Sequence, residues 1–282
     1  MVRTERQSYR IRLAAPAIAL VLLLACGGSP SGPTSTPAIP GFTLTGDPAS
    51  AAGATWVYRA DAGGVHYDLQ GVLFKPQASG LLPAVIISHG LGGSADGYSS
   101  RIARVMVGWG LVCIATNYTH AGGVPIGSPG TISEPGASPP NIQRARQLVE
   151  LLRAFGYVDM NRVALHGHSF GAFVTTATAG TYPQLFRVAS HTAGGTLPDL
   201  SFTTAVPTSS QVAAIRAPYQ MHHGDRDIVV PLLADQLLDA ALASRGVSHE
   251  LFVYPGADHD SMSTNETMLD RVRAWYSSKG MF

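Results

Sequence analysis

The sequence predicts an α/β fold in which an open, mostly parallel sheet is covered by helices on both faces. From about residue 55 onward, short apolar runs alternate with longer segments of helical periodicity, as expected when each strand is followed by a crossover helix. The 282 residues are 45% hydrophobic and only 13% charged, which suits one globular domain with a large core. No internal repeat is visible, so a solenoid is not expected.

The first expected elements are two antiparallel strands at 55–59 and 65–74, joined by the turn Asp61-Ala62-Gly63-Gly64. A buried strand at 83–88 then runs into glycine-rich sequence. A helix at 98–108 leads to a further strand at 111–117.

Residues 120–140 contain five glycines and five prolines and are predicted to form a long irregular loop beside the site. Asn141 is expected to cap an amphipathic helix. The elements expected after that helix are strands at 163–168, 188–192, 218–223 and 250–254, and helices from 170, at 231–244 and at 267–277. In the 231–244 helix, the leucines at 232, 233, 237, 238 and 242 are expected to face the core.

The N-terminus has the pattern of an export signal. Four arginines precede a nearly unbroken apolar run at 13–25, which is shorter than the about 20 residues that a membrane helix needs. The run ends in Leu23-Leu24-Ala25-Cys26, which resembles the lipobox of bacterial lipoproteins. We therefore predict a signal peptide at 1–25, a lipidated Cys26 followed by a Gly/Ser/Pro/Thr-rich linker to residue 50, and a catalytic domain at 51–282. An ordinary signal peptide with an incidental cysteine is the alternative.

Charge and cysteine content narrow the possible partners. The formal net charge is +1, and it becomes −2 without residues 1–25, so neither nucleic acid nor an anionic membrane surface is expected as a partner. Cys113 would have no disulfide partner once Cys26 is acylated, and we expect it to pack in a strand. We expect an exported monomer, held in the periplasm or at the cell surface by its lipid alone.

A candidate nucleophile follows the apolar run Val163-Ala164-Leu165. The pentapeptide Gly167-His168-Ser169-Phe170-Gly171 is typical of a serine on a tight turn between a strand and a helix, where small neighbours relieve steric crowding. His168 is expected to face away from the reacting carbonyl group.

A serine nucleophile requires a base and an acid that orients the base. Both are expected after Ser169 in the chain, with the acid before the base. Asp227 follows the strand at 218–223 and is the predicted acid, and His259 follows the strand at 250–254 and is the predicted base. Asp225 competes for the acid role, although a short carboxylate there more often braces a turn.

Two backbone N–H groups are predicted to bind the oxyanion. One belongs to Phe170, and the other to Leu91 in His89-Gly90-Leu91-Gly92-Gly93 after the strand at 83–88. Tyr118 and His120, with Phe170, are the predicted substrate-binding wall residues. The loops at 120–140 and 194–207 are expected to shape the pocket. No cofactor is required. Five histidines on or beside strand ends show no spacing typical of a metal site and are expected to pack or hydrogen-bond around the turn: His166, His168, His191, His222 and His223.

With these motifs the chain resembles the dienelactone-hydrolase-like branch of the α/β-hydrolases over residues 55–280. Ser88-His89-Gly90-Leu91-Gly92 and the serine pentapeptide are similar to platelet-activating-factor acetylhydrolases, and residues 115–119 resemble cutinase-type polyester hydrolases. The resemblance implies an α/β-hydrolase fold with Ser169, Asp227 and His259 as catalytic residues. Residues 193–197 depart from the tryptophan-bearing stretch of the polyester hydrolases.

We therefore predict an exported serine carboxylesterase that cleaves short-chain or compact esters through an acyl-enzyme. Little room for a lid lies between the strands at 188–192 and 218–223. A cutinase-like polyester hydrolase is the alternative, and a catalytically silent binding lipoprotein is a third possibility. A peptidase of the same fold would usually carry a large additional domain.

Overall fold

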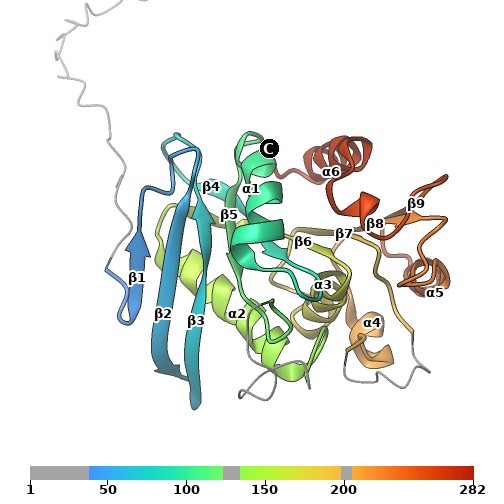
Figure 1. The fold of residues 1–282 in the computed structure, drawn as a ribbon, viewed down its shortest axis with the longest axis horizontal. Coiled ribbons are helices and arrows are strands. Elements are labelled where there is room, and N and C mark those ends of the chain that lie inside the picture. Colours follow the sequence, from blue (N-terminus) through green and yellow to red (C-terminus); the bar gives the residue numbers. More distant parts are fainter. Residues whose placement is uncertain (1–37, 123–133, 198–204) are drawn as a thin grey trace, which may run out of the picture. The chain divides into compact units, whose positions relative to one another are not determined.

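The structure is a computed structural model that describes residues 38–122, 134–197 and 205–282. Within these residues the chain forms one nine-stranded sheet with the order β1-β2-β3-β5-β4-β6-β7-β8-β9 (Figure 1). The strands are β1 Phe42–Thr45, β2 Ala54–Ala62, β3 Val65–Phe74, β4 Leu82–Ser88, β5 Val112–Thr116, β6 Val158–His168, β7 Val188–Thr192, β8 Tyr219–Gly224 and β9 His249–Tyr254.

The sheet is antiparallel at one edge and parallel elsewhere. Strands β1, β2 and β3 pair antiparallel, and β3 pairs antiparallel with β5. Strands β5, β4, β6, β7, β8 and β9 are parallel neighbours. Every residue of β4, β5 and β7 is buried, as expected for strands with helices on both faces.

Helices cover both faces of the sheet (Figure 1). They are α1 Ser100–Val107, α2 Pro139–Ala154, α3 Phe170–Thr181, α4 Ser209–Ala214, α5 Leu233–Ala243 and α6 Glu266–Ser278, with single turns at Ala95–Ser99 and Ser261–Thr264. Apolar residues of α1 and α6 share one core cluster, and those of α2 and α5 share another. The predicted architecture is confirmed. Among the described helices, none is both long and apolar enough to cross a lipid bilayer.

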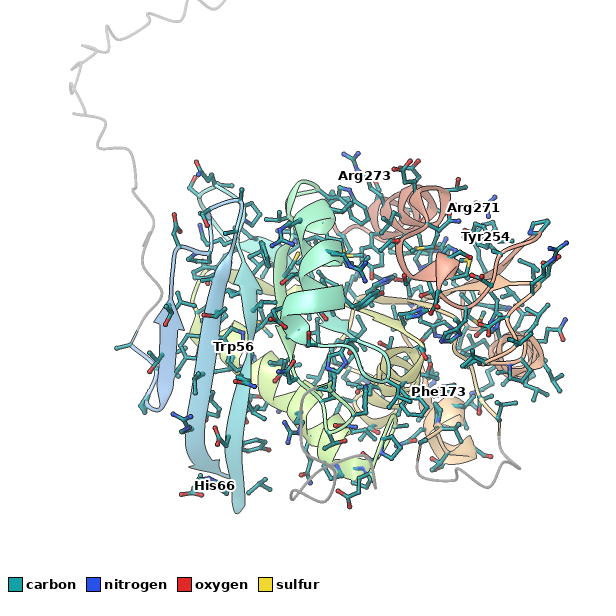
Figure 2. All side chains as sticks on the ribbon, in the orientation of Figure 1. Trp56, His66, Phe173, Tyr254, Arg271 and Arg273 are labelled. Atoms are coloured by element: carbon teal, nitrogen blue, oxygen red, sulfur yellow. The ribbon has the colours of Figure 1, made fainter. Side chains whose placement is uncertain are left out.

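The sheet begins earlier than the sequence suggested. Strand β1 lies within the range 26–50 that we predicted to be a linker. Phe42 explains its place, because its ring stacks on Trp56 at 5.8 Å and meets the edge of Phe155 at 5.5 Å. Trp56, labelled in Figure 2, is buried and donates its indole N–H to the carbonyl of Val72. Four residues are too few for a clear alternating pattern, so β1 was missed.

Two helices also differ from expectation. Helix α2 begins at Pro139 with Ser138 as its N-cap, so Asn141 lies inside the first turn and does not cap it. The side chain of Asn141 instead accepts the N–H of Thr119 at 3.0 Å and donates to the carbonyl of Gly136 at 3.0 Å. Helix α4 was not predicted, and Thr208 with Gln211 forms its capping box.

The orientation of α5 is the most consequential difference. Leu233 and Leu237, which we expected in the core, are 53% and 37% exposed. Asp235 is fully buried in their place, together with Leu238 and Leu242. A buried carboxylate requires a charged or hydrogen-bonding partner, and two histidines supply it, as described below.

Candidate active site

Ser169 occupies a strained turn between β6 and α3. Its φ of 56° and ψ of −123° place a non-glycine residue in the left-handed half of backbone space. The turn is tight enough that a β-carbon on Gly167 would lie 2.2 Å from the carbonyl oxygen of Gly171, and one on Gly171 would lie 2.1 Å from that of Ser88. The N–H of Ser169 donates to the carbonyl of Thr192 on β7 at 3.1 Å. The two glycines therefore permit the turn, and the neighbouring strand anchors it.

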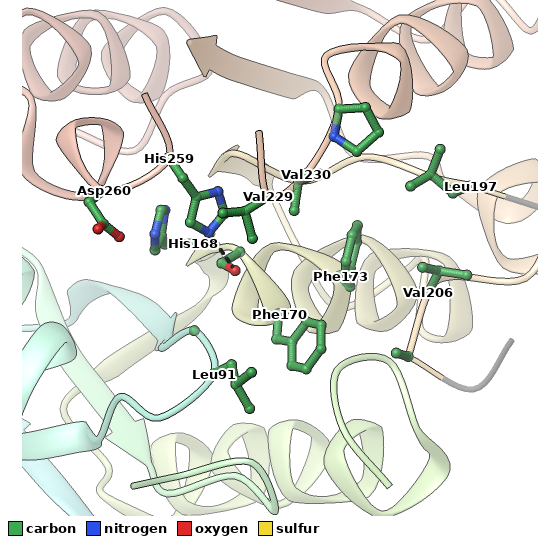
Figure 3. A pocket seen from close by; sticks show the side chains of 14 residues that line it. Leu91, His168, Phe170, Phe173, Leu197, Val206, Val229, Val230, His259 and Asp260 are labelled. Atoms are coloured by element: carbon green, nitrogen blue, oxygen red, sulfur yellow. Dashed lines mark hydrogen bonds between the residues drawn. The ribbon is translucent and has the colours of Figure 1, made fainter. Parts of the chain in front are cut away.

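The structure brings the three predicted polar residues into one hydrogen-bonded chain. Figure 3 shows the His259 ring at the pocket, with its hydrogen bond to the serine hydroxyl as a dashed line. The hydroxyl of Ser169 lies 2.9 Å from Nε2 of His259, and Nδ1 of His259 lies 2.7 Å from Oδ2 of Asp227. Because a carboxylate only accepts, Nδ1 carries a proton and Nε2 is left to accept the serine proton. His259 and Asp227 reach Ser169 from the loops after β9 and β8, at the carboxyl edge of the parallel strands.

Asp227 is fixed on its other side by the backbone. Its Oδ1 accepts the N–H groups of Val229 and Val230, each at 2.8 Å. Burial would raise the pKa of Asp227, but hydrogen bonds from His223, His259 and the Val230 N–H lower it below the ordinary range of a carboxyl group. The carboxylate is therefore ionised at neutral pH and has one available orientation.

The neighbouring acidic residues have structural contacts. Asp225, the alternative acid, accepts the N–H of Gly256 at 2.7 Å and so joins the β8 and β9 loops. Asp258 accepts the N–H of Ser261 at 2.9 Å. Neither carboxylate has a hydrogen bond to His259 within the described residues.

A pocket of about 500 Å³ opens beside Ser169. One wall is apolar, and Figure 3 shows its side chains surrounding the space next to the serine. This wall consists of Phe170, Phe173, Leu197, Val206, Val229 and Val230. Phe170 was a predicted site residue, and Leu197 and Val206 lie in the 194–207 loop that we expected to shape the pocket. Phe173, Val229 and Val230 were not predicted, because they come from segments that the sequence does not place together.

The two predicted oxyanion donors lie in this pocket. Leu91 and Phe170 both line it. Within the described part of the chain, the backbone N–H of neither residue has a hydrogen-bond partner. Phe170 is also the first residue of α3, where N–H groups carry a partial positive charge.

Tyr118 and His120 do not line the pocket, which corrects our prediction. Both are buried, and their rings stack at 5.6 Å beneath the loop that carries Leu91. His120 donates from Nε2 to the carbonyl of His89, and Tyr118 shares a hydrogen bond with Ser88. His120 also meets the edge of Phe170 at 5.5 Å, so this pair supports the pocket wall from behind.

His168 also differs from expectation. Its ring lines the pocket and lies 4.9 Å from the ring of His259, whereas we expected it to face away. Its Nδ1 is 2.9 Å from the hydroxyl of Thr192. Burial and the nearby His259 lower the pKa of His168 to about 3, so it is a neutral ring against the base.

Some predictions concern residues outside the described part. Cys26 and the signal peptide lie there, as do residues 123–133 of the predicted loop and residues 198–204. The described ends of the second loop do contribute, because Leu197, Ala205 and Val206 line the pocket, whereas no described residue of the 120–140 loop lines it. Cys113 is buried in β5 and is a free thiol. Among the described residues, no group of His, Cys, Asp and Glu could hold a metal ion.

Comparison with known proteins gives a family. The dienelactone hydrolase family matches over residues 69–275. A Synechocystis protein with the provisional name carboxymethylenebutenolidase is 26% identical over 236 residues, covering 76% of this chain and 91% of its own length. The structure of esterase Est2 from Thermogutta terrifontis has a TM-score of 0.63 at 17% identity, covering 80% of this chain and 92% of the esterase, and shares the fold.

One further match covers only a short part of the chain. The poly(3-hydroxyalkanoate) depolymerase C of Paucimonas lemoignei is 44% identical over 50 residues, which are 18% of this chain and 12% of the depolymerase.

Buried neutral histidines around the elbow predict acid sensitivity. Burial lowers the pKa of His89 to about 4 and of His120, His166 and His168 to about 3. Unfolding returns each to its ordinary value near 6.5, so the unfolded chain binds more protons below that pH. The stabilisation is complete above pH ~6.5 and is lost toward the folded pKa, at up to about 1.4 kcal/mol per pH unit for each histidine.

Denaturant titrations between pH 7 and 4.5 will measure this slope. His166→Asn is expected to make it shallower by about 1.4 kcal/mol per pH unit. His66→Asn is the matched control, because the His66 side chain is 71% exposed. An unchanged slope in His166→Asn would contradict the assignment.

Proposed function

The chain belongs to the dienelactone hydrolase family and is a hydrolase of the α/β-hydrolase fold, and from this premise we propose that it is a carboxylesterase acting on short-chain or compact esters. The observation that carries the proposal is the chain of hydrogen bonds from Ser169 through His259 to Asp227, at 2.9 and 2.7 Å. Its serine end opens into a pocket with an apolar wall.

The first chemical step follows from this geometry. His259 takes the proton of Ser169 as the serine oxygen attacks the ester carbonyl, and Asp227 stabilises the imidazolium that forms. The oxyanion accepts hydrogen bonds from the backbone N–H groups of Leu91 and Phe170. The imidazolium then protonates the leaving alcohol, which leaves an acyl group on Ser169.

The second step reverses the first with water. Neutral His259 takes a proton from a water molecule that attacks the acyl-enzyme, and the same two N–H groups hold the oxyanion. Collapse of this intermediate releases the acid and returns the proton to Ser169. The chain's own residues therefore supply every proton transfer.

The pocket favours a compact apolar group on the substrate. About 500 Å³ is at the lower end of typical small-molecule sites. Phe173 on α3 lines the pocket, as do Leu197 and Val206 from the segment between β7 and β8, and none of them carries a charge. Among the described residues of this wall, a charged substrate group would find no partner to offset its desolvation.

A polyester hydrolase is the second candidate, and exposed apolar residues favour it. Ile228 is 96% exposed, Val229 64% and Leu91 55%, and all three lie beside the proposed catalytic residues. Such a rim suits contact with an apolar surface. The local similarity to a polyhydroxyalkanoate depolymerase is consistent with it.

Esterase activity is tested on p-nitrophenyl esters. The domain from residue 38 onward should hydrolyse the acetate and butyrate, with rates falling as the acyl chain lengthens beyond the pocket. Ser169→Ala should lose at least about 10³-fold in kcat/KM because no other nucleophile lies at the elbow. Ser210→Ala, in the exposed first turn of α4, is the matched control. Equal rates in wild type and Ser169→Ala would instead favour a silent binding protein.

Polymer hydrolysis is tested on a polyester film. Ile228→Ser should reduce product release from the film by about fivefold, because the variant loses the apolar contact that Ile228 would make with the film, and should leave p-nitrophenyl butyrate hydrolysis unchanged. Leu81→Ser is the control, since Leu81 is 60% exposed but precedes β4 at the opposite edge of the sheet. A film rate that is equal in all three proteins would exclude contact through this rim.

We also propose that the enzyme is exported and held in the cell envelope by acylated Cys26. In a bacterial host the full chain should sediment with membranes and incorporate labelled fatty acid. Cys26→Ser should release it into the soluble fraction, because a protein without acyl chains loses its membrane anchor. Cys113→Ser is the control. Membrane association of Cys26→Ser would contradict the proposal.

A further inference from the structure

The polar chain does not end at Asp227 but continues into the core. His223 is the penultimate residue of β8, and its Nε2 lies 3.4 Å from Oδ2 of Asp227. Its Nδ1 lies 2.7 Å from Oδ2 of Asp235 on α5. The other oxygen of Asp235 lies 2.6 Å from Nε2 of His191 on β7. The side chains of His223, Asp235 and His191 are completely buried.

The far end of this network returns to the elbow helix. Nδ1 of His191 is 2.9 Å from the hydroxyl of Tyr219, which is 2.8 Å from the hydroxyl of Thr176. Thr176 lies on α3 and donates to the carbonyl of Ala172, three residues after Ser169. The hydrogen bonds therefore lead from Ser169 through His259 and the buried residues back to α3, the helix whose N-cap is Ser169.

The partners of His223 define where its protons are. Nε2 lies 2.9 Å from the carbonyl oxygen of Val230 and also faces the Asp227 carboxylate. Both partners only accept hydrogen bonds, so Nε2 carries a proton. Nδ1 faces the Asp235 carboxylate at a distance typical of a charge-assisted hydrogen bond.

We propose that His223 is a buried imidazolium that acts as a positioning residue, held between Asp235 and Asp227 so that its charge offsets that of Asp235 and holds the Asp227 carboxylate aligned with His259. Asp235 is the counter-charge that makes this cation stable in the core. Sequence reasoning placed His223 only among histidines that pack near the turn.

The electrostatics of the pair agree with the geometry. Burial would lower the pKa of His223, but hydrogen bonds to Asp227 and Asp235 raise it to about 10. Burial would raise the pKa of Asp235, but its two histidine partners lower it to about 2. Both groups are therefore charged through the neutral range.

The charges explain what the pair contributes to the proposed reaction. When His223 is positive, the charges of Asp227, Asp235 and His223 add up to −1. This net charge equals that of a site with a single aspartate. Without the His223 cation, two buried carboxylates would lie on the same side of His259. They would stabilise protonated His259 and so withdraw the base at a pH where it should be neutral.

The inference rests on the proposed esterase function, and it is tested by the acidic limb of the pH profile, the range in which kcat/KM falls as the pH is lowered. His223→Gln removes the cation, so this limb should move to higher pH by about one unit. At pH values below the limb, kcat/KM should then be about tenfold lower than in the wild type. His223→Gln/Asp235→Asn removes one charge of each sign and should return the limb toward its wild-type position. Packing or hydrogen bonding alone would not produce such a recovery.

The limb could also respond to other charges near His223. Asp227 and Asp235 face it directly, His259 lies beyond Asp227, and His191 with Tyr219 lies beyond Asp235. His222→Gln is the matched control: His222 is buried on the same strand but bonds to Tyr254 and Gln220, so the limb should stay in place. A limb that is unmoved in folded His223→Gln, or equally displaced in the double variant, overturns the proposal.

A second measurement needs neither activity nor a stable variant. In wild-type protein with ¹⁵N-labelled histidine, both ring nitrogens of His223 should show imidazolium shifts from pH 6 to about 8.5. The His222 ring provides the contrast, since burial lowers the pKa of His222 well below its ordinary value. A neutral His223 ring at pH 7 overturns the proposal. An inactive enzyme with a charged His223 would instead overturn only the esterase function.

Discussion

The backbone conformation of Ser169 is the constraint on which the site depends. A left-handed φ at a non-glycine residue is unfavourable, and it persists here because Gly167 and Gly171 allow two chain segments to approach more closely than any side chain would permit. The turn places the serine at the carboxyl end of β6 and places the N–H of Phe170 at the start of α3. The proposed oxyanion donor and the proposed nucleophile are therefore positioned by one local feature.

Parallel strands then bring the remaining groups to the same edge. Strands β4, β6, β8 and β9 run in one direction, so the loops that follow them carry Leu91, Ser169, Asp227 and His259 to one end of the sheet. Beside these groups, α3 and the β7–β8 segment contribute the apolar side chains that line the pocket.

The sequence predicted what depends on local pattern and chain order. The sequence predicted the alternation of strands and helices, and it predicted the two loops that carry Asp227 and His259. These loops could be placed because the carboxyl ends of parallel strands lie at the same edge of the sheet. The four-residue β1 was missed because its partners, Trp56 and Phe155, are distant in the sequence. Tyr118 and His120 were placed in the pocket because polar aromatic residues near a site suggest a wall, yet their hydrogen bonds to Ser88 and His89 keep them beneath it.

Helix α5 shows why the buried network could not be predicted. Leucine content suggested that Leu233 and Leu237 face the core, but the paired histidines of β7 and β8 favour burial of Asp235 instead. In evolutionary terms, the network constrains which residues can occupy its positions on α3, β7, β8 and α5. Loss of His223 or Asp235 alone would leave a buried charge without its partner, so relatives that lack one should also lack the other. The pair should therefore be gained and lost together as lineages diverge, independently of the residues that line the pocket.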